Sequence, residues 1–145
     1  MDFSITRMDV WAGELEDRPG ALSSRLATIM MIGEADLDFV VVRPLNHKPG
    51  RGVLFIAPLE GPEQTKTAED AGLRKSNSMF VVRLEGPDHP GLAAGVAGTL
   101  ARADVNITGM TAAATKGNAL IYLRFTTERE ADAAIELLKT SLAEG

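Results

Sequence analysis

Two short segments hold residue types that could grip a small charged molecule: Asp17-Arg18-Pro19-Gly20 and Asp88-His89-Pro90-Gly91. In each segment the glycine lets the backbone approach a ligand without a Cβ in the way. A helix that begins there leaves its first backbone N–H groups unpaired, and such amides attract a carboxylate or a phosphate. The aspartate can hold an ammonium group. Each segment therefore carries groups for both ends of an α-amino acid.

The simpler interpretation of each segment is structural. Aspartate is among the preferred N-cap residues, and proline fits the first turn of a helix. A glycine beside proline shapes the turn. For one such segment alone, helix capping is the stronger interpretation, and the recurrence of the segment is what favours a shared binding role.

The residues that follow the two segments also recur. Each copy continues with a small-residue run at helical spacing and then a hydrophobic strand, at residues 35–39 in the first copy and 103–107 in the second. An internal repeat of this kind indicates two copies of one supersecondary unit. We predict two repeats, residues 1–74 and 75–145, with residues 73–78 as the only candidate boundary.

Hydrophobic periodicity predicts the same element order in each repeat: strand, helix, strand, strand, helix. The expected strands are residues 5–15, 37–43, 53–57, 79–84, 105–114 and 119–125. The expected helices span residues 17–32, 61–72 and 90–103, and a last one starts at Thr126 or Thr127. This order predicts an α+β fold of ferredoxin-like type, with antiparallel sheets covered by helices on one face.

A complete unit of this type ends in a fourth strand. The first repeat has room only for a short one near residues 73–76, and the second has no residues for one after its last helix. An open sheet edge must be short, covered or paired. We therefore expect pairing between the two repeats, and a homodimer.

Composition excludes several classes of function. The formal net charge of -5 argues against nucleic acid or an anionic membrane as the main partner. The absence of cysteine excludes disulfides and thiolate chemistry. No apolar run approaches the roughly 20 residues that span a bilayer, and the first residues lack the features of a secretory signal. We expect a cytoplasmic protein.

Five single residues are further candidates for chemistry. His47 and His89 are expected to be exposed loop residues, too isolated for a metal site, which needs three or four convergent ligands. Trp11 is expected in the core or an interface. Met30 and Met31 are expected on the face of a helix that packs against the protein core. The sequence indicates no metal and no cofactor.

The stretches DRPGALSSRLATIM with ADLDF, and DHPGLAAGVAGTLARADVNI, resemble the opening of the ACT domain, the βαββαβ small-molecule-binding module of amino-acid metabolism. The second stretch is the more specific, because the first has Asp38-Phe39 in place of Asn106-Ile107. The resemblance implies tandem ACT-type repeats that pair edge to edge and bind an amino acid between neighbours. The sequence departs from the family pattern in two places. The terminal strand is missing, and the strand at residues 111–115 contains only small side chains.

The resemblance also implies binding residues, carried over by matching positions. They are Asp88, Gly91, Leu92, Ala93 and Asn106 in the second repeat, and Asp17, Gly20, Ala21, Leu22 and Asp38 in the first. If Asp38 lies near Asp17, the first pocket is the more acidic and attracts cations.

Two functions remain open. The first is a non-catalytic regulatory protein that binds an amino acid and signals its occupancy to an enzyme. The second is a ligand-free interaction subunit of a biosynthetic enzyme, which uses its exposed sheet edge. An enzyme is not expected, because the sequence has no Gly-x-Ser-x-Gly, P-loop or His-Glu pair. RNA binding is not expected either, because the sheet lacks stacking aromatic residues.

Overall fold

The computed structural model describes residues 2–143, and these residues form an α+β fold with six strands and four helices. The chain divides into two compact units. We call residues Asp9–Ser76 the N-terminal unit, and the residues from Asn77 on, together with those up to Met8, the C-terminal unit. The observed boundary near residue 76 lies close to the expected one, but the start of the chain belongs to the second unit.

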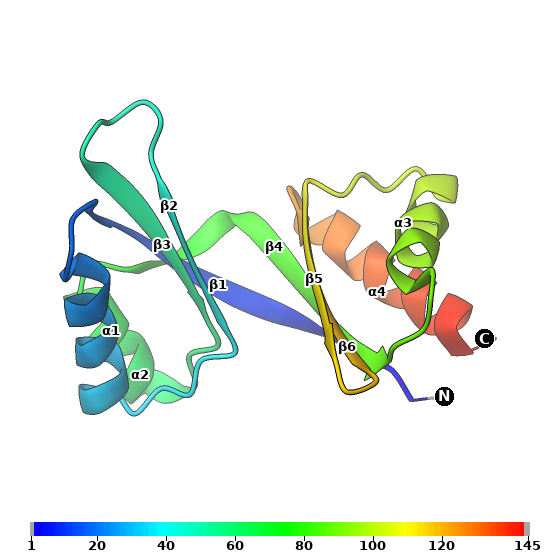
Figure 1. The fold of residues 1–145 in the computed structure, drawn as a ribbon, viewed down its shortest axis with the longest axis horizontal. Coiled ribbons are helices and arrows are strands. Elements are labelled where there is room, and N and C mark those ends of the chain that lie inside the picture. Colours follow the sequence, from blue (N-terminus) through cyan, green and yellow to red (C-terminus); the bar gives the residue numbers. More distant parts are fainter. Residues whose placement is uncertain (1, 144–145) are drawn as a thin grey trace. The chain divides into compact units, whose positions relative to one another are not determined.

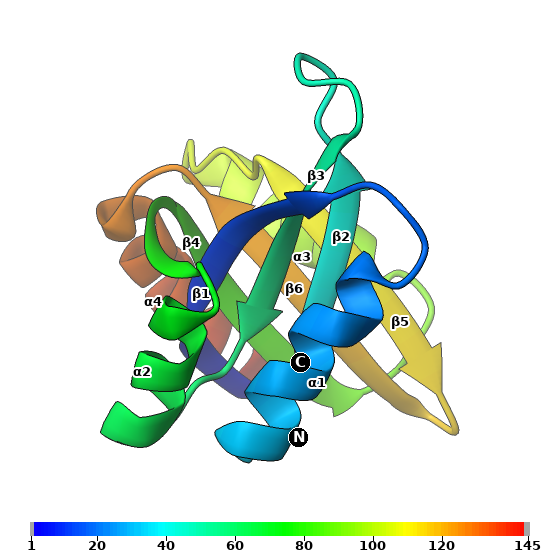
Figure 2. The same ribbon diagram turned by 90° about the vertical axis from the view of Figure 1, so that its left-hand side faces the viewer.

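The N-terminal unit contains the later half of β1 (Ser4–Glu16), α1 (Ala21–Ile32), β2 (Phe39–Pro44), β3 (Arg51–Ala57), α2 (Gly61–Asp70) and the start of β4 (Arg74–Pro87). Its strand order is β2-β3-β1-β4. Strand β3 pairs antiparallel with β1 and with β2. Helices α1 and α2 lie side by side over this sheet (Figure 2).

A buried cluster between these helices and the sheet holds the N-terminal unit together. It contains Trp11, Leu15, Ile29, Leu54, Ile56 and Leu73. Trp11 is 8% exposed, which confirms the expected core position. A Cβ on Gly13 of β1 would lie 2.8 Å from the carbonyl oxygen of Gly72, so the glycine permits the chain before β4 to approach β1. The short fourth strand expected near residues 73–76 is the beginning of β4.

The C-terminal unit contains the rest of β4, α3 (Leu92–Arg102), β5 (Gly109–Thr115), β6 (Asn118–Phe125) and α4 (Glu128–Ala143), with the start of β1. Its strand order is β1-β4-β6-β5. Strand β6 pairs antiparallel with β4 and with β5. Helices α3 and α4 lie on one face of these strands (Figure 1).

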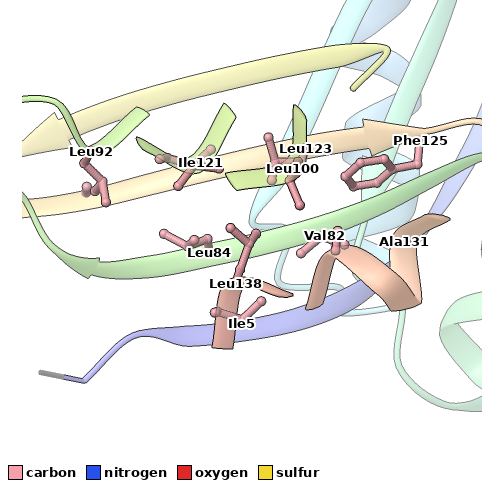
Figure 3. Packing of buried hydrophobic residues seen from close by; sticks show 13 residues of the cluster. Ile5, Val82, Leu84, Leu92, Leu100, Ile121, Leu123, Phe125, Ala131 and Leu138 are labelled. Atoms are coloured by element: carbon pink, nitrogen blue, oxygen red, sulfur yellow. The ribbon is translucent and has the colours of Figure 1, made fainter. Parts of the chain in front are cut away.

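The start of β1 supplies the strand that the second repeat lacks. Ile5 packs in one core cluster with Val82 and Leu84 of β4 (Figure 3). The Arg7 guanidinium donates to Asp132 of α4 at 2.7 Å and lies 5.6 Å from the Phe80 ring centroid. The strand missing after α4 is therefore replaced by the start of β1, which lies beside β4 in the sheet.

The ends of the helices differ in how they are formed. Before α4, the Thr127 hydroxyl accepts a hydrogen bond from the Glu130 N–H at 3.1 Å and so caps this helix. Helix α1 ends as expected at Ile32. Its Met30 and Met31 are 48% and 80% exposed, however, so their expected core position is wrong.

No described helix is long and apolar enough to cross a bilayer.

Candidate functional site

The two Asp-x-Pro-Gly loops adopt the same turn. The N–H of Ala21 donates to the carbonyl of Arg18 at 3.3 Å, and the N–H of Leu92 donates to the carbonyl of His89 at 3.2 Å. Between them, Gly20 and Gly91 have φ of 89° and 85°. Proline followed by a positive-φ residue is the pattern of a type II turn, which favours glycine at that position. The repeated sequence thus produces a repeated backbone.

The aspartates do not cap these helices, contrary to the structural interpretation of the sequence. The N-cap residues are Gly20 and Gly91, and neither helix has a side-chain cap hydrogen bond. Both prolines precede the helices. The expectation that Asp17 caps α1 with Pro19 in its first turn is therefore wrong.

Each aspartate is instead held by its own backbone. The N–H of Asp17 donates to the carbonyl of Gly50 at 3.0 Å, and that of Asp88 donates to Gly117 at 2.9 Å. Both acceptors lie in the hairpin turns that join the next two strands. Both carboxylates are exposed, and neither has an ion-pair or hydrogen-bond partner within residues 2–143. They remain able to bind a cationic group.

The first helical amides after each turn are also open. The N–H groups of Leu22 and Ser23 in α1, and of Ala93 and Ala94 in α3, have no acceptor in the described part of the chain. Free N–H groups at a helix start, where the helix dipole is positive, attract an anionic group.

In the C-terminal unit this loop borders a hollow of about 280 Å³, which we call the C-terminal hollow. Its lining comprises Asp88, His89, Gly91, Leu92, Ala93, Ala94, Ala112, Ala113, Ala114, Ala119 and Ile121. Ala112 pairs with Ile121, and Ala114 pairs with Ala119. Directly paired residues share a sheet face, so these four side chains form one apolar wall. Leu92 and Ile121 lie near each other on the helix-covered face (Figure 3).

In the N-terminal unit the matching loop borders a hollow of about 240 Å³, which we call the N-terminal hollow. Its lining comprises Leu15, Glu16, Asp17, Arg18, Leu22, Val42, Arg43, Pro44 and Gly52. Four of these residues are charged. The Arg18 guanidinium forms an ion pair with Glu16 and holds the pKa of that carboxyl below its ordinary value. Its lining therefore holds more charged residues than that of the C-terminal hollow, beside the apolar Leu15, Leu22 and Val42.

The structure brings together some of the expected binding residues and separates others. Asp88, Gly91, Leu92 and Ala93 all line the C-terminal hollow. Asp17 and Leu22 line the N-terminal hollow, while Gly20 forms the adjacent turn and Ala21 lines a neighbouring hollow.

Asn106 and Asp38 lie elsewhere in the fold. Strands β5 and β2 begin only at Gly109 and Phe39, so both polar residues precede their strand. The hollows adjoin the opposite ends of these strands, because Thr115 pairs with Asn118 and Pro44 with Gly52. Asp38 therefore lies away from Asp17 and does not make the first pocket more acidic.

Sequence reasoning missed the wall of the C-terminal hollow. Ala112, Ala114 and Ile121 are too ordinary in type to indicate a site. The available signal was the two-residue period of any strand, which places Ala112 with Ala114, and Ala119 with Ile121, on one face. Within residues 2–143, no group of three or more metal-ligating side chains comes together.

The family match falls within one of the two units. Residues 80–142, within the C-terminal unit, match the ACT domain family. No curated protein matches the chain.

Three solved structures are similar to almost the whole chain. A protein from Bacteroides thetaiotaomicron is 20% identical with a TM-score of 0.74, covering 97% of this chain and 90% of that one. The ligand-free regulatory subunit of aspartate kinase from Thermus thermophilus is 12% identical with a TM-score of 0.61, covering 96% and 95%. The regulatory subunit of aspartate kinase from Thermus flavus is 11% identical with a TM-score of 0.59, covering 98% and 97%.

These identities are low, so the likenesses establish the fold. The sequence match is confined to the unit that carries the apolar hollow. The chain therefore has the fold of these regulatory subunits and an ACT domain match over residues 80–142.

Proposed function

We propose that this chain is a non-catalytic regulatory protein of amino-acid metabolism, which acts in the cytoplasm and binds a free amino acid in the C-terminal hollow. One observation carries the proposal. The open amides of Ala93 and Ala94 and the unpartnered carboxylate of Asp88 border the same hollow. These are complementary groups for the two charged ends of one small molecule.

The chemistry of the hollow indicates how the ligand is held. Its carboxylate accepts hydrogen bonds from the amides at the start of α3, and its ammonium group donates to Asp88. Gly91 leaves room for this approach, since nothing lies within 4 Å of the position of an added Cβ. The side chain then rests on Ala112 and Ile121, which favours a small apolar amino acid.

We further infer that both units are ACT-type modules in tandem. The support is their shared element order and the same turn in the two loops. The N-terminal hollow has four charged residues in its lining, so we assign the amino acid to the C-terminal unit. Occupancy regulates a partner enzyme only if one arrangement of the protein binds the amino acid better than another does.

Calorimetry of the full chain against the twenty amino acids tests the proposal. We expect binding of one or a few apolar amino acids, and a loss of about tenfold or more in affinity for Asp88→Asn, since a charge-assisted hydrogen bond is removed. Asp17→Asn is the matched control and should leave the affinity unchanged. Absence of heat with all twenty at millimolar concentration contradicts the proposal.

A ligand-free interaction subunit is the second candidate, and β5 favours it. Every residue of β5 from Met110 to Thr115 is exposed, and this strand lies at the edge of its sheet. Such an edge can pair with a second copy in a homodimer or with a partner enzyme. A binding partner whose affinity is the same with and without amino acids would favour this candidate.

A further inference from the structure

A separate hollow of about 260 Å³ lies beside the start of α1 in the N-terminal unit, and we call it the arginine hollow. Its lining comprises Leu15, Glu16, Arg18, Ala21, Ser24, Arg25 and Arg51. The three guanidinium groups come from three different parts of the fold. Arg18 stands in the loop before α1, Arg25 on α1 itself, and Arg51 at the first position of β3.

The lining carries more positive than negative charge. Glu16 is its only carboxylate, and it is paired with Arg18. Glu14 lies close by but is shared, since its carboxylate is 3.1 Å from Lys48 Nζ and 3.7 Å from Arg51 Nε. Asp17 borders the adjacent N-terminal hollow. Three arginines against one lining carboxylate leave a cationic hollow in a chain of net charge -5.

The guanidinium donors are not all used within the protein. Arg18 uses Nε on Glu16 and one terminal nitrogen on the Pro19 carbonyl. Arg25 donates through one terminal nitrogen to the Glu14 carbonyl at 3.3 Å. Each guanidinium has five N–H donors, so several remain for a ligand. Hydrogen bonds from the Lys48 and Arg18 side chains hold the pKa values of Glu14 and Glu16 below their ordinary value, as expected in a cationic environment.

We propose that the arginine hollow binds a phosphate group, either as the free ion or as a phosphate monoester. Planar guanidinium groups match the oxygens of phosphate in geometry and charge. The Ser24 hydroxyl in the lining adds a further donor. The site is independent of the amino-acid site, since it belongs to the other unit and uses none of its residues.

The C-terminal unit has no equivalent of this site. His89 stands at the position of Arg18 in the turn, and Val96 at the position of Arg25 in the helix. Asn118 opens β6 as Arg51 opens β3. All three arginines are therefore replaced by residues without a permanent charge.

A titration of the ¹⁵N-labelled full chain, followed by NMR, tests the proposal. Inorganic phosphate is added at a constant ionic strength of about 0.15 M set with sodium chloride, so that general screening does not change. We expect saturable shifts of the backbone amides around Arg25 and Arg51. Glycerol 3-phosphate in a parallel titration distinguishes the two sources: tighter binding indicates a monoester ligand, and weaker binding the free ion.

Three single variants decide whether the arginines hold the ion. Arg25→Gln and Arg51→Gln should each weaken phosphate binding roughly tenfold, because each removes charge-assisted hydrogen bonds. Arg18→Gln alters an exposed side chain and keeps the test valid if a less exposed variant fails to fold. Lys66→Gln on α2, outside the lining, is the control and should bind as the wild type does. No saturable shift, or unchanged affinity in all three arginine variants, would overturn the proposal.

Discussion

The loops at Asp17 and Asp88 share one backbone conformation, but different residues lie across from them. Each makes the same turn, places a glycine at the helix start and holds its aspartate against a hairpin glycine. Across from the loop, β5 and β6 offer alanine and isoleucine, while β2 offers Val42, Arg43 and Pro44. The repeated turn is thus set against different facing strands in the two units.

The two helices that follow these loops are also anchored differently. Helix α3 buries Leu92, Val96 and Leu100, whereas α1 buries only Ile29. Deeper burial gives α3 the stronger hydrophobic anchor. The turn that we assign to the ligand is thus the one on the better-fixed helix.

The largest expected effect is the loss of folding stability when a buried apolar residue, rather than an exposed one, is replaced by alanine. Leu100→Ala should lower the free energy of unfolding by about 2–5 kcal/mol, because the side chain is fully buried and leaves a cavity. Met31→Ala, at 80% exposure on α1, should change it by less than about 0.5 kcal/mol. Urea denaturation followed by circular dichroism measures both. Equal losses in the two variants would contradict the described burial.

The second prediction compares the same substitution, glycine to valine, in the two turns. Gly91→Val and Gly20→Val should each lower the free energy of unfolding by roughly 1–2 kcal/mol, since both glycines have positive φ. Only Gly91→Val should abolish amino-acid binding, because its side chain would enter the C-terminal hollow. Calorimetry beside thermal denaturation checks both effects. Retained binding in Gly91→Val would place the ligand elsewhere.

The third prediction compares the helices without mutation. Amide hydrogen exchange should be faster in α1 than in α3, because fewer buried contacts oppose local opening. The amide of Ile32 should exchange faster than that of Leu100, which lies in the better-packed helix. Exchange followed by NMR at neutral pH gives the ratio directly. Slower exchange throughout α1 would reverse the inferred order of anchoring.

The smallest expected effect concerns pH. The pKa of Glu85 is lowered, first by the hydrogen bond from Asn118 and then by Arg83. A lowered carboxyl pKa stabilises the fold above the unfolded value and loses this contribution as pH falls through the folded value. Stability should therefore decline slightly between about pH 5 and pH 3. Glu85→Gln should flatten that decline in urea midpoints, and an unchanged slope would count against it.

Much of the fold could be predicted from the sequence because local patterns determine it. The apolar run along β6 and the helical spacing from Leu92 to Leu100 indicate elements that the structure contains. The start of β1 could not be assigned locally. Its role in the C-terminal unit depends on Ile5 packing beside Val82, a contact between residues far apart in the chain.

The candidate site also has one part that local sequence predicts and one part that it does not. The residue types of the Asp88 loop indicate a binding loop, so its position beside a hollow could be predicted. The wall opposite depends on the register of β5 against β6, which aligns Ala112 with Ile121. Asn106 matched a family position in sequence, yet β5 begins three residues later and places it away from the hollow.

The most direct test follows the amides of Ala93 and Ala94 by NMR while an apolar amino acid is added to the full chain. These two N–H groups are open in the described structure, and we assign the ligand carboxylate to them. The account predicts large saturable shifts at both amides and none at Leu22 or Ser23. Saturable shifts at α1 instead of α3, or none in either helix with any amino acid, would contradict it.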